Sequence, residues 1–407
     1  MIDPSLWAFG DKRVLLLQGP IGPFFRRLAT DLRESGATVF KINFNGGDCL
    51  FYPSDATLFR GKPCEWPDFF KKYIADNRIE MVMLFGDCRP IHEVAHRICR
   101  IQGVEIGVFE EGYLRPDYVS FERYGVNGNS LLPRNPKFYR RIVIAKYEKP
   151  LPVGNAFWYA TVWAMLYNTV GAILKPFFPH YQHHRTLTIT EGLLWLRSFW
   201  RKYYYAKKER EIGGLLSGDL AHRYFLVPLQ VHNDAQIYKH SDFSSVGDFI
   251  KQVLQSFADD APINTHLVVK HHPLDRGCSD YTELIESSVE ELGLQGRVYY
   301  VHDLPMPALL RHTRGVVTIN STVGLAALQH GVPLKILGKA IYAIEGLVFP
   351  DSLANFWRTP KRGNMELYRQ FRTYLIRVAQ LNGSFYRRLA LAESHSGIVW
   401  SRWKKSV

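Results

Sequence analysis

The strongest constraint on the fold of this 407-residue chain is the segment 315–328, which runs from an apolar stretch through a small-residue turn into a helix-forming stretch. A strand that ends in a capping turn before a helix is the basic unit of an open α/β sheet. Asn320, Ser321 and Thr322 can cap the helix, and Gly324 would let the backbone approach a ligand. The first turn of such a helix can bind a phosphate through its N–H groups, although an ordinary helix cap explains the same residues.

The N-terminal part of the chain begins with a β-turn-α-β pattern. Residues 13–18 form an apolar run, a turn containing Gly19 and Gly22 follows, and 38–43 supplies the next strand. Further strands are predicted at 81–85 and 105–109. The glycine turn differs from the G-x-G-x-x-G dinucleotide fingerprint, so we expect no nicotinamide or flavin site.

The second half of the chain alternates strands and helices in the same way. Its predicted strands are 224–229, 267–270, 298–301, 316–319 and 334–337. Together the two halves predict an α/β fold with two doubly wound, Rossmann-like domains facing across a cleft. The expected boundaries are 1–150 for the N-terminal domain, 151–215 for a helical insertion, 216–345 for the C-terminal Rossmann-like domain and 346–407 for C-terminal helices.

Charge and cysteine content limit the class of partner. A formal net charge of +13 and an aromatic content of 14% indicate an anionic partner such as nucleic acid, an anionic bilayer or an anionic sugar. No helix-turn-helix, RNP or basic-region pattern supports nucleic acid. The five cysteines form no C-x-x-C pair, which argues against a zinc knuckle or a disulfide framework and fits the reducing cytoplasm. The N-terminus shows no basic-then-apolar export leader.

An uncharged, aromatic segment at 156–174 lies between the two halves. It is nearly long enough to span a bilayer, but Asn168 and Thr169 interrupt it and a Lys-Pro pair at 175–176 follows it. An aromatic and basic helix is predicted at 193–208. The two segments predict a helical hairpin that lies in the surface of an anionic membrane, and two helices packed on an interdomain core are the alternative.

Two adjacent glutamates, Glu110 and Glu111, stand at the end of a predicted strand. Successive residues of a strand point to opposite faces, so only one of the two easily reaches the cleft. Partial burial there would raise the pKa of that carboxyl group into the range of a general acid. A helix-terminal acid or a salt bridge to Arg115 is the alternative.

Polar residues also follow the strands of the second half. Gln230 and Asp234 come after one strand, and Lys270, His271 and His272 come at the end of the next. If Asp234 faces one of the glutamates, the pair has the elements of glycosyl transfer, although the sequence does not give their separation. The histidines have no partners at metal-ligand spacing, so we expect them to contact phosphate or base, and we expect no metal.

Seven short motifs occur in order along the chain, at 18–25, 42–48, 109–116, 125–127, 230–234, 270–273 and 320–324. Together they resemble the KpsS-type capsule polysaccharide biosynthesis proteins of Gram-negative bacteria, and the match covers nearly the whole chain. The resemblance implies a GT-B-like fold and a metal-independent, retaining β-Kdo transferase that needs no cofactor and takes CMP-β-Kdo as donor substrate. The implied acceptor is phosphatidylglycerol or its lyso form, on which the enzyme starts the poly-Kdo linker as a peripheral protein of the inner membrane's cytoplasmic face.

The resemblance also implies roles for individual residues. Asp234 would be the nucleophile, and Glu110 or Glu111 would be the acid or base at the acceptor oxygen. The donor would bind to Lys270, His271, His272, Pro273, Asn320, Ser321, Thr322 and Gly324. Further substrate contacts are expected from Gln18, Gly19, Gly22, Arg115 and Gln230. CMP-Kdo carries a phosphate and a carboxylate, which cations and helix N–H groups would bind.

A non-catalytic, membrane-peripheral scaffold of a capsule assembly or export complex is the alternative function. Such a scaffold would use the aromatic hairpin to recruit partners, and it predicts binding without turnover. Other capsule assembly proteins are further candidate partners, whereas nucleic acid is not.

Overall fold

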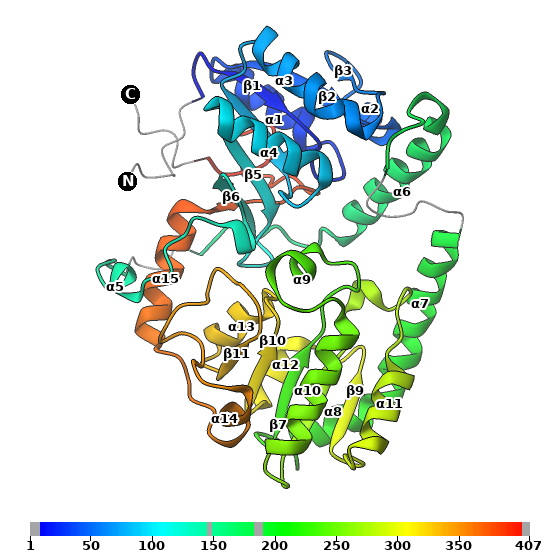
Figure 1. The fold of residues 1–407 in the computed structure, drawn as a ribbon, viewed down its shortest axis with the longest axis vertical. Coiled ribbons are helices and arrows are strands. Elements are labelled where there is room, and N and C mark those ends of the chain that lie inside the picture. The colour runs from blue at the N-terminus through cyan, green and yellow to red at the C-terminus, as the bar shows by residue number, and fades with distance from the viewer. Residues whose placement is uncertain (1–8, 145–148, 183–189, 401–407) are drawn as a thin grey trace. The chain divides into compact units, whose positions relative to one another are not determined.

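The computed structural model describes residues 9–144, 149–182 and 190–400 (Figure 1). The chain forms two compact units. Unit 1 comprises residues 1–131, 145–187 and 373–407, and unit 2 comprises 132–144 and 188–372. The N-terminal residues in which we expected no export leader lie outside the described part of the chain.

Unit 1 is built on one seven-stranded sheet with the order β12-β6-β5-β4-β1-β2-β3. Its strands are β1 (Arg13–Leu16), β2 (Thr38–Asn43), β3 (Thr57–Leu58), β4 (Met81–Phe85), β5 (Glu105–Glu111), β6 (Tyr118–Arg123) and β12 (Gln380–Asn382). Neighbours from β5 to β3 in this order pair in parallel, whereas β6 is antiparallel to both β5 and β12. The β-turn-α-β expectation for the N-terminal part is confirmed.

Helices cover both faces of the unit 1 sheet. The unit contains α1 (Phe24–Glu34), α2 (Gly46–Phe51), α3 (Trp66–Asp76), α4 (Pro90–Gln102) and α6 (Phe157–Ile173), which packs on α2. Leu16 and Met83 pack with α1 on one face, and Leu15 and Leu84 pack with α3 and α4 on the other. This alternation explains why both strands are continuous apolar runs, since each residue is buried on one face or the other.

Unit 2 contains a five-stranded, fully parallel sheet with the order β11-β10-β7-β8-β9. Its strands are β7 (Tyr224–Pro228), β8 (His266–Lys270), β9 (Val298–Val301), β10 (Gly315–Thr318) and β11 (Leu334–Ile336). Phe225 packs with α10 (Val246–Asp260), α11 (Thr282–Glu291) and α14 (Leu353–Arg358) on one face. On the other face, the hydroxyl of the neighbouring Tyr224 donates a hydrogen bond at 2.7 Å to the Leu309 carbonyl of α12 (Met306–His312).

The remaining helices connect these elements. They are α5 (Pro136–Tyr139), α7 (Thr190–Lys208), α8 (Arg210–Ser217), α9 (Ala235–His240), α12 (Met306–His312), α13 (Val323–Gln329) and α15 (Met365–Val378), with 3₁₀ turns η1 (Pro63–Glu65), η2 (Asn127–Asn129), η3 (Lys175–Phe177) and η4 (Pro273–Asp275). The side chains at 193–196, 198 and 199 of the predicted aromatic and basic helix lie outside the described residues.

The two units differ from the expected domain boundaries. The expected insertion 151–215 is divided, because α6 belongs to unit 1 whereas α7 and α8 belong to unit 2. The expected C-terminal helices 346–407 are also divided: α15 spans the boundary between the units, and the segment after it supplies β12 to the unit 1 sheet. Leu381, Phe385 and Ile398 are buried in the unit 1 core, which explains why this short segment returns there.

Helix α6 packs closely on α2. A Cβ added at Gly47 would lie 2.4 Å from the Tyr167 ring, and one added at Gly46 would lie 2.6 Å from Leu174 Cβ. These glycines therefore let one side of the apolar helix pack against α2. Among the residues that the structure describes, no helix combines the length and the apolar character needed to cross a membrane.

Candidate functional site

Both sheets reverse their strand order once, and polar residues gather at the carboxyl ends of the strands at that point. In unit 1 the first strand, β1, lies between β2 and β4, and in unit 2 the first strand, β7, lies between β8 and β10. Open α/β sheets bind their ligands outside the strand ends at such switch points. The β1–β4 and β7–β10 switch points are therefore the two candidate sites.

At the switch point of unit 1, Gln18 follows β1 and Arg89 follows β4. Arg89 Nη1 donates to Gln18 Oε1 at 2.8 Å, which joins the two strand ends. The guanidinium also lies over the Phe85 ring, 5.2 Å from its centroid. Gln18 was predicted from the sequence as a substrate contact, whereas Arg89 was not. Its position in the loop after a predicted strand was the available signal.

A buried network fixes the other side of the Gln18 amide. Gln18 Nε2 donates to the hydroxyl oxygens of Tyr181 at 2.8 Å and Tyr167 at 3.1 Å. Tyr167 donates to Asp48 Oδ1 at 3.0 Å, and Asp48 Oδ2 accepts from the Phe44 N–H at 3.0 Å. Burial raises the pKa of both tyrosines, so their hydroxyl groups keep their protons. The network holds the Gln18 oxygen toward Arg89.

Glu110 lies near the end of β5, close to this switch point. Its Oε1 accepts from the Glu111 N–H at 3.0 Å. A Cβ placed on Gly86 would lie 3.6 Å from Glu110 Oε2 and 3.8 Å from Arg89 Nε, so all three groups share one small region. Burial, aided by the charges of Glu111 and Asp87, raises the pKa of Glu110 to about 7. Near neutral pH this carboxyl group exists in both protonation states, which suits a general acid or base.

Glu111 has a different environment. Its Oε1 accepts a hydrogen bond from the Tyr386 hydroxyl at 2.7 Å. Burial first, and then the charge of Glu111, raises the pKa of Tyr386 well above its usual range, so the hydroxyl remains a donor. Arg115 Nε donates to the carbonyl of Gly112 at 3.3 Å. The two adjacent glutamates thus have separate surroundings, and Glu110 is the stronger acid–base candidate.

The glycine turn after β1 serves packing. A Cβ added at Gly19 would lie 2.7 Å from the Phe25 ring, and one at Gly22 would lie 3.1 Å from the Trp163 ring. Gly22 also has a φ of +121°, which other residues rarely adopt. The spaces beside the predicted substrate-contact glycines are therefore occupied by aromatic side chains.

At the switch point of unit 2, the structure brings together three predicted residues. Gln230 Nε2 donates to Asn320 Oδ1 and to Asp234 Oδ2, each at 3.0 Å. Asn320 Nδ2 donates in turn to the Gln236 carbonyl at 2.9 Å. The amide of Gln230 therefore joins the ends of β7 and β10, much as Gln18 joins the ends of β1 and β4.

Asp234 is the N-cap residue of α9. Its Oδ1 accepts from the Gln236 N–H at 2.9 Å, while Oδ2 accepts from Gln230. Capping of this kind stabilises a helix by roughly 1 kcal/mol. The predicted nucleophile is therefore held in one orientation, and both of its oxygens already have donors.

Two residues before Asp234, His232 pairs with a buried carboxylate. Its Nδ1 lies within hydrogen-bond distance of Asp275 Oδ1, and its backbone N–H donates to Asp275 Oδ2 at 3.1 Å. Asp275 belongs to the turn η4 after β8 and is fully buried. Sequence reasoning did not identify this pair, because the partners are 43 residues apart along the chain.

Lys270 uses its ammonium group inside the fold. Lys270 Nζ donates to the His302 carbonyl at 2.6 Å and to the His271 carbonyl at 3.3 Å. Burial lowers the pKa of Lys270 to about 8. The lysine that we expected to contact the donor is therefore engaged with the backbone at the ends of β8 and β9.

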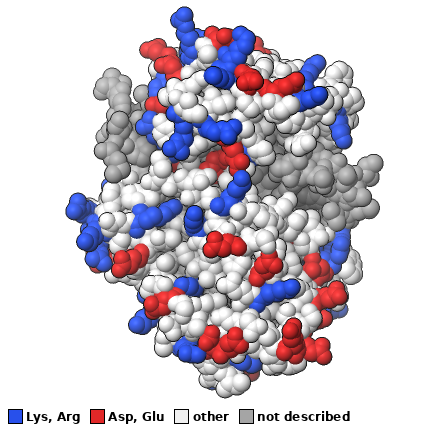
Figure 2. Space-filling view, viewed as in Figure 1, with Lys and Arg blue, Asp and Glu red and all other residues white. Residues whose placement is uncertain are grey.

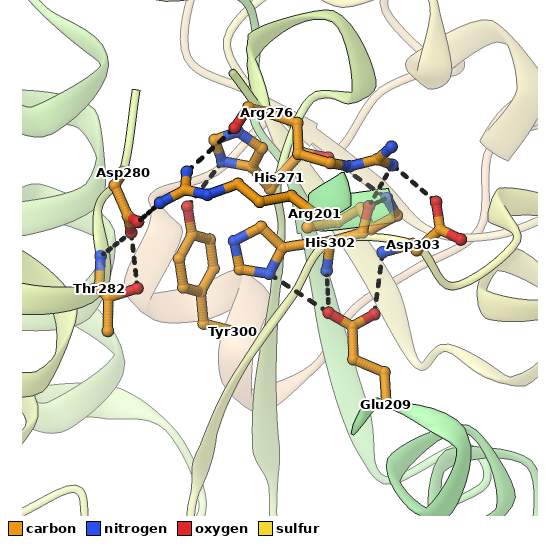
Figure 3. A network of polar contacts seen from close by, with 10 residues as sticks. Arg201, Glu209, His271, Arg276, Asp280, Thr282, Tyr300, His302 and Asp303 are labelled. Atoms are coloured by element: carbon orange, nitrogen blue, oxygen red, sulfur yellow. Dashed lines mark hydrogen bonds and ion pairs between the residues drawn. The ribbon is translucent and has the colours of Figure 1, made fainter. Parts of the chain in front are cut away.

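A network around these strand ends also holds the α7–α8 junction (Figure 3). Glu209 Oε1 accepts from the His302 N–H at 2.6 Å, and Glu209 Oε2 accepts from the Asp303 N–H at 2.8 Å. Arg201 of α7 forms an ion pair with Asp280 at 2.7 Å. These contacts could not be predicted from the sequence, because Glu209 follows a basic helix and looks like one more charged surface residue.

The neighbouring histidines have distinct environments. His271 Nδ1 lies 2.6 Å from the Tyr300 hydroxyl, and burial lowers the pKa of His271 to about 4, so its ring is neutral. His272 Nδ1 accepts from the Leu274 N–H at 3.2 Å and thereby caps η4. Pro273 is exposed at the start of that turn.

The turn before α13 is closed on one side. Ser321 Oγ accepts from the Val323 N–H at 3.3 Å, whereas the Thr322 side chain makes no cap. A Cβ added at Gly324 would lie 2.4 Å from the Tyr342 hydroxyl oxygen, and that hydroxyl donates to the Ser321 carbonyl. Gly324 is therefore required by the packing of Tyr342, whereas we had expected it to admit a ligand.

Neither switch point presents a metal site built from the described residues. Within 9–144, 149–182 and 190–400, no group of three or more His, Cys, Asp or Glu side chains is placed to hold a metal ion. The polar groups at the two switch points are amides, an arginine and carboxylates, which suit a polar and partly anionic organic substrate.

These observations define a two-unit, Rossmann-like α/β protein with a polar site at the switch point of each unit. A family model described as capsule polysaccharide biosynthesis protein matches residues 80–386, and the chain belongs to this family. The resemblance inferred from the seven motifs is confirmed.

Individual relatives extend the match over most of the chain. The chain is 40% identical over 389 residues to the Escherichia coli protein named capsule polysaccharide export protein KpsS, covering 92% of this chain and 97% of that protein. It is 40% identical over 392 residues to the capsule polysaccharide modification protein LipB of Neisseria meningitidis serogroup A, covering 93% and 92%. Among solved structures, the β-Kdo 2,7 transferase of Thermosulfurimonas dismutans KpsC aligns with a TM-score of 0.40 and 13% identity, covering 92% of this chain and 93% of that one.

Proposed function

We propose that the chain is a retaining β-Kdo transferase that moves Kdo from CMP-β-Kdo to phosphatidylglycerol or its lyso form. Family membership and 40% identity to proteins named for capsule polysaccharide export and modification support a role in making capsule. The donor and the acceptor come from the resemblance carried by the seven motifs. The observation that carries the catalytic part is Glu110, whose pKa of about 7 suits proton transfer at neutral pH.

In this proposal, CMP-Kdo binds at the β7–β10 switch point. Asp234 would attack the anomeric carbon and displace CMP, giving a Kdo ester on the enzyme. Gln230 and the α9 N–H group hold the carboxylate in one orientation, which favours a defined line of attack. A second displacement by the acceptor would restore the original configuration.

The lipid acceptor would bind at the β1–β4 switch point. Glu110 would remove the proton from the attacking glycerol hydroxyl. Arg89 offers a guanidinium held by Gln18 and Phe85, and a fixed guanidinium suits the phosphate of a phosphatidylglycerol headgroup. This arrangement would put the lipid phosphate near the base that activates its glycerol.

We further propose that the protein binds the cytoplasmic face of the inner membrane without spanning it. The side of α6 that faces away from α2 exposes an outer stripe, which consists of Trp158, Val162, Met165 and Ile173. Exposed aromatic and aliphatic side chains on one helix face suit insertion into a lipid surface. On the face shown in Figure 2, basic and acidic side chains are interspersed, so attachment there would depend on apolar contact as well as charge.

The decisive experiment is mass spectrometry of a fluorescent lysophosphatidylglycerol after incubation with ready-made CMP-Kdo and the protein. The expected product is the lipid with one or more added Kdo residues. Asp234→Asn is the best active-site variant, because asparagine is also a good N-cap and so keeps α9 while removing the nucleophile. Asp259→Ala on the exposed side of α10 is the matched control. Full activity of Asp234→Asn would exclude Asp234 as the nucleophile.

A second candidate function is a non-catalytic scaffold for capsule assembly or export. One observation favours it. Internal contacts engage four residues that were predicted to bind substrate, namely Lys270, Gly324, Gly19 and Gly22. If the protein is a scaffold, it should bind lipid vesicles but form no Kdo product at any donor concentration. Product formation that Asp234→Asn abolishes would exclude it.

A further inference from the structure

His232 and Asp275 form a pair at the β7–β10 site that has the geometry of an oriented imidazole. Asp275 uses one carboxylate oxygen for the His232 ring at Nδ1 and the other for the His232 backbone N–H. The Asp275 side chain is 1% exposed, whereas the His232 side chain is 42% exposed. A buried carboxylate therefore holds a histidine whose ring still reaches solvent.

The contact determines which ring nitrogen is available. A carboxylate accepts hydrogen bonds, so Nδ1 carries the proton that it donates to Asp275. Nε2 is then the ring nitrogen that is left to contact a ligand. The same logic orients the histidine in acid–base dyads of hydrolytic enzymes.

The surroundings keep both partners in place. The Tyr238 hydroxyl donates to the His232 carbonyl at 2.7 Å. On the other side, Arg276 Nη2 forms an ion pair with Asp303 at 2.6 Å, and Arg201 donates to the Arg276 carbonyl at 3.0 Å. The turn that carries Asp275 is thus fixed to the end of β9 and to α7, as Figure 3 shows for Arg201, Arg276 and Asp303.

The position of the pair relates it to the proposed donor site. His232 lies between Gln230 and Asp234 in the loop that leaves β7, and Asp275 follows the neighbouring strand β8. We propose that His232 Nε2 contacts the phosphate of the CMP leaving group, and that Asp275 is the residue that positions His232. This inference rests on the proposed transferase function and adds a catalytic residue to it.

The chemistry of the first displacement needs such a group. As an Asp234 oxygen forms its bond to the anomeric carbon, the bond from that carbon to the phosphate oxygen breaks, and its electron pair leaves with CMP. The phosphate changes from a monoanionic diester to a monoester that carries one more negative charge. The breaking bond leaves negative charge on the phosphate oxygen, and a protonated His232 can donate a hydrogen bond or its Nε2 proton to that oxygen. No other reactant is required.

The test measures CMP binding and turnover in the full-length protein with the variants His232→Gln, Asp275→Asn and both together. His330→Gln, at an exposed histidine of the same unit, is the matched control. We expect His232→Gln to lower kcat about 100-fold while kcat/KM for the lipid acceptor stays nearly unchanged, because His232 acts only in the first displacement. It should also weaken CMP binding, measured by calorimetry, about tenfold, the size of one lost charge-assisted hydrogen bond.

Asp275→Asn should lower kcat about tenfold in the wild-type background and not at all in the His232→Gln background, because Asp275 acts only through the histidine. Melting temperatures verify that each variant is folded. If Asp275→Asn does not fold, His232→Gln alone tests whether His232 contacts the phosphate. This variant should fold, because the His232 ring is partly exposed to solvent.

The possible outcomes separate this inference from the proposed function. If the wild type neither binds CMP nor transfers Kdo, both are overturned together. If the wild type transfers Kdo and His232→Gln matches the His330→Gln control in kcat and in CMP affinity, the transferase stands and the role of His232 is overturned. Additive losses in the double variant would overturn the positioning role of Asp275.

Discussion

The Tyr386 hydroxyl donates to Glu111 Oε1 at 2.7 Å, and this contact distinguishes two adjacent glutamates that the sequence left equivalent. Glu110, in contrast, receives a backbone N–H and has its second oxygen beside Gly86 and Arg89. An acid already bound by a tyrosine is poorly placed to accept a substrate proton. The structure therefore favours Glu110 as the acid or base of the proposed reaction.

The first prediction tests this assignment. Glu110→Gln should lower turnover by about 10³-fold, whereas Glu111→Gln should lower it no more than about tenfold. Initial rates of Kdo transfer to lysophosphatidylglycerol provide the measurement. Tyr386→Phe is the control, because it removes the partner of Glu111 without changing either carboxylate. A larger loss in Glu111→Gln than in Glu110→Gln would reverse the assignment.

The second prediction concerns the pH dependence of stability. The folded state raises the pKa of Glu110 from 4.5 to about 7, mainly through burial. Between these values the folded state binds more protons than the unfolded state, so this residue makes the free energy of unfolding fall as pH rises. Glu110→Gln removes this pH-dependent decrease in the free energy of unfolding. The variant should therefore gain stability relative to wild type from pH 4.5 to 7 and keep a constant advantage above pH 7, as measured by urea unfolding.

A stability difference between Glu110→Gln and wild type that does not change with pH would contradict the raised pKa. Glu34→Gln, at an exposed position on α1, provides a control for pH effects that do not involve burial.

The sheets were predictable from the sequence because their strands are short apolar runs between turn signals. The residues after those runs, such as Gln18, Glu110 and Gln230, were predictable for the same reason, since parallel strand ends meet at one edge. The hydrogen-bond partners of those residues could not be predicted from the sequence. Tyr386 approaches Glu111 from 275 residues away along the chain, and no local pattern encodes such a contact.

Lys270 and Gly324 show a second limit of the sequence. A lysine at a strand end and a glycine in a helix-opening turn suit an anion site and a packed core equally well. Backbone carbonyls satisfy the lysine, and the Tyr342 ring fills the space beside the glycine. Only the three-dimensional arrangement decides between the two roles, because the partners come from other strands and loops.

The third prediction concerns Lys270. Its ammonium donates to the carbonyls of His302 and His271, so Lys270→Ala should lower the free energy of unfolding by about 1–3 kcal/mol. The affinity of the folded protein for CMP should change less than about threefold, within the scatter of such effects. Lys251→Ala, on the exposed side of α10, should change stability by no more than about 0.5 kcal/mol. A large loss of CMP affinity at unchanged stability would restore the donor contact that the sequence suggested.

The fourth prediction concerns metal ions. Amides, Arg89 and helix N–H groups would bind the substrate anions, so transfer from ready-made CMP-Kdo should continue in excess chelator. CMP-Kdo must be supplied as such, because its enzymatic synthesis can itself require a metal ion. The readout is the product yield with chelator, without chelator and after addition of single divalent metals. Loss of transfer in chelator that one metal restores would refute the prediction.

The fifth prediction concerns the outer stripe of α6. Trp158, Met165 and Ile173 are exposed by 66%, 57% and 67%, and the other side of the helix packs on α2. Replacing these three residues by serine should therefore abolish flotation with phosphatidylglycerol vesicles while leaving the melting temperature nearly unchanged. Ile101→Ser, at an apolar residue of α4 that is 79% exposed, is the matched control and should float like wild type.

Salt separates the apolar contribution of α6 from the charge contribution of α7. Lys202, Lys207 and Lys208 are exposed on α7, and each cation near an anionic surface contributes about 1 kcal/mol, which salt screens. Wild-type protein should therefore float at low salt and largely dissociate at high salt. The α6 variant should still transfer Kdo to a short-chain acceptor below its micelle concentration, because the proposed chemistry uses Glu110 and Arg89 and none of the three exposed α6 residues. If wild-type protein resists extraction by both high salt and alkaline carbonate, attachment is integral and the surface-bound interpretation of α6 is wrong.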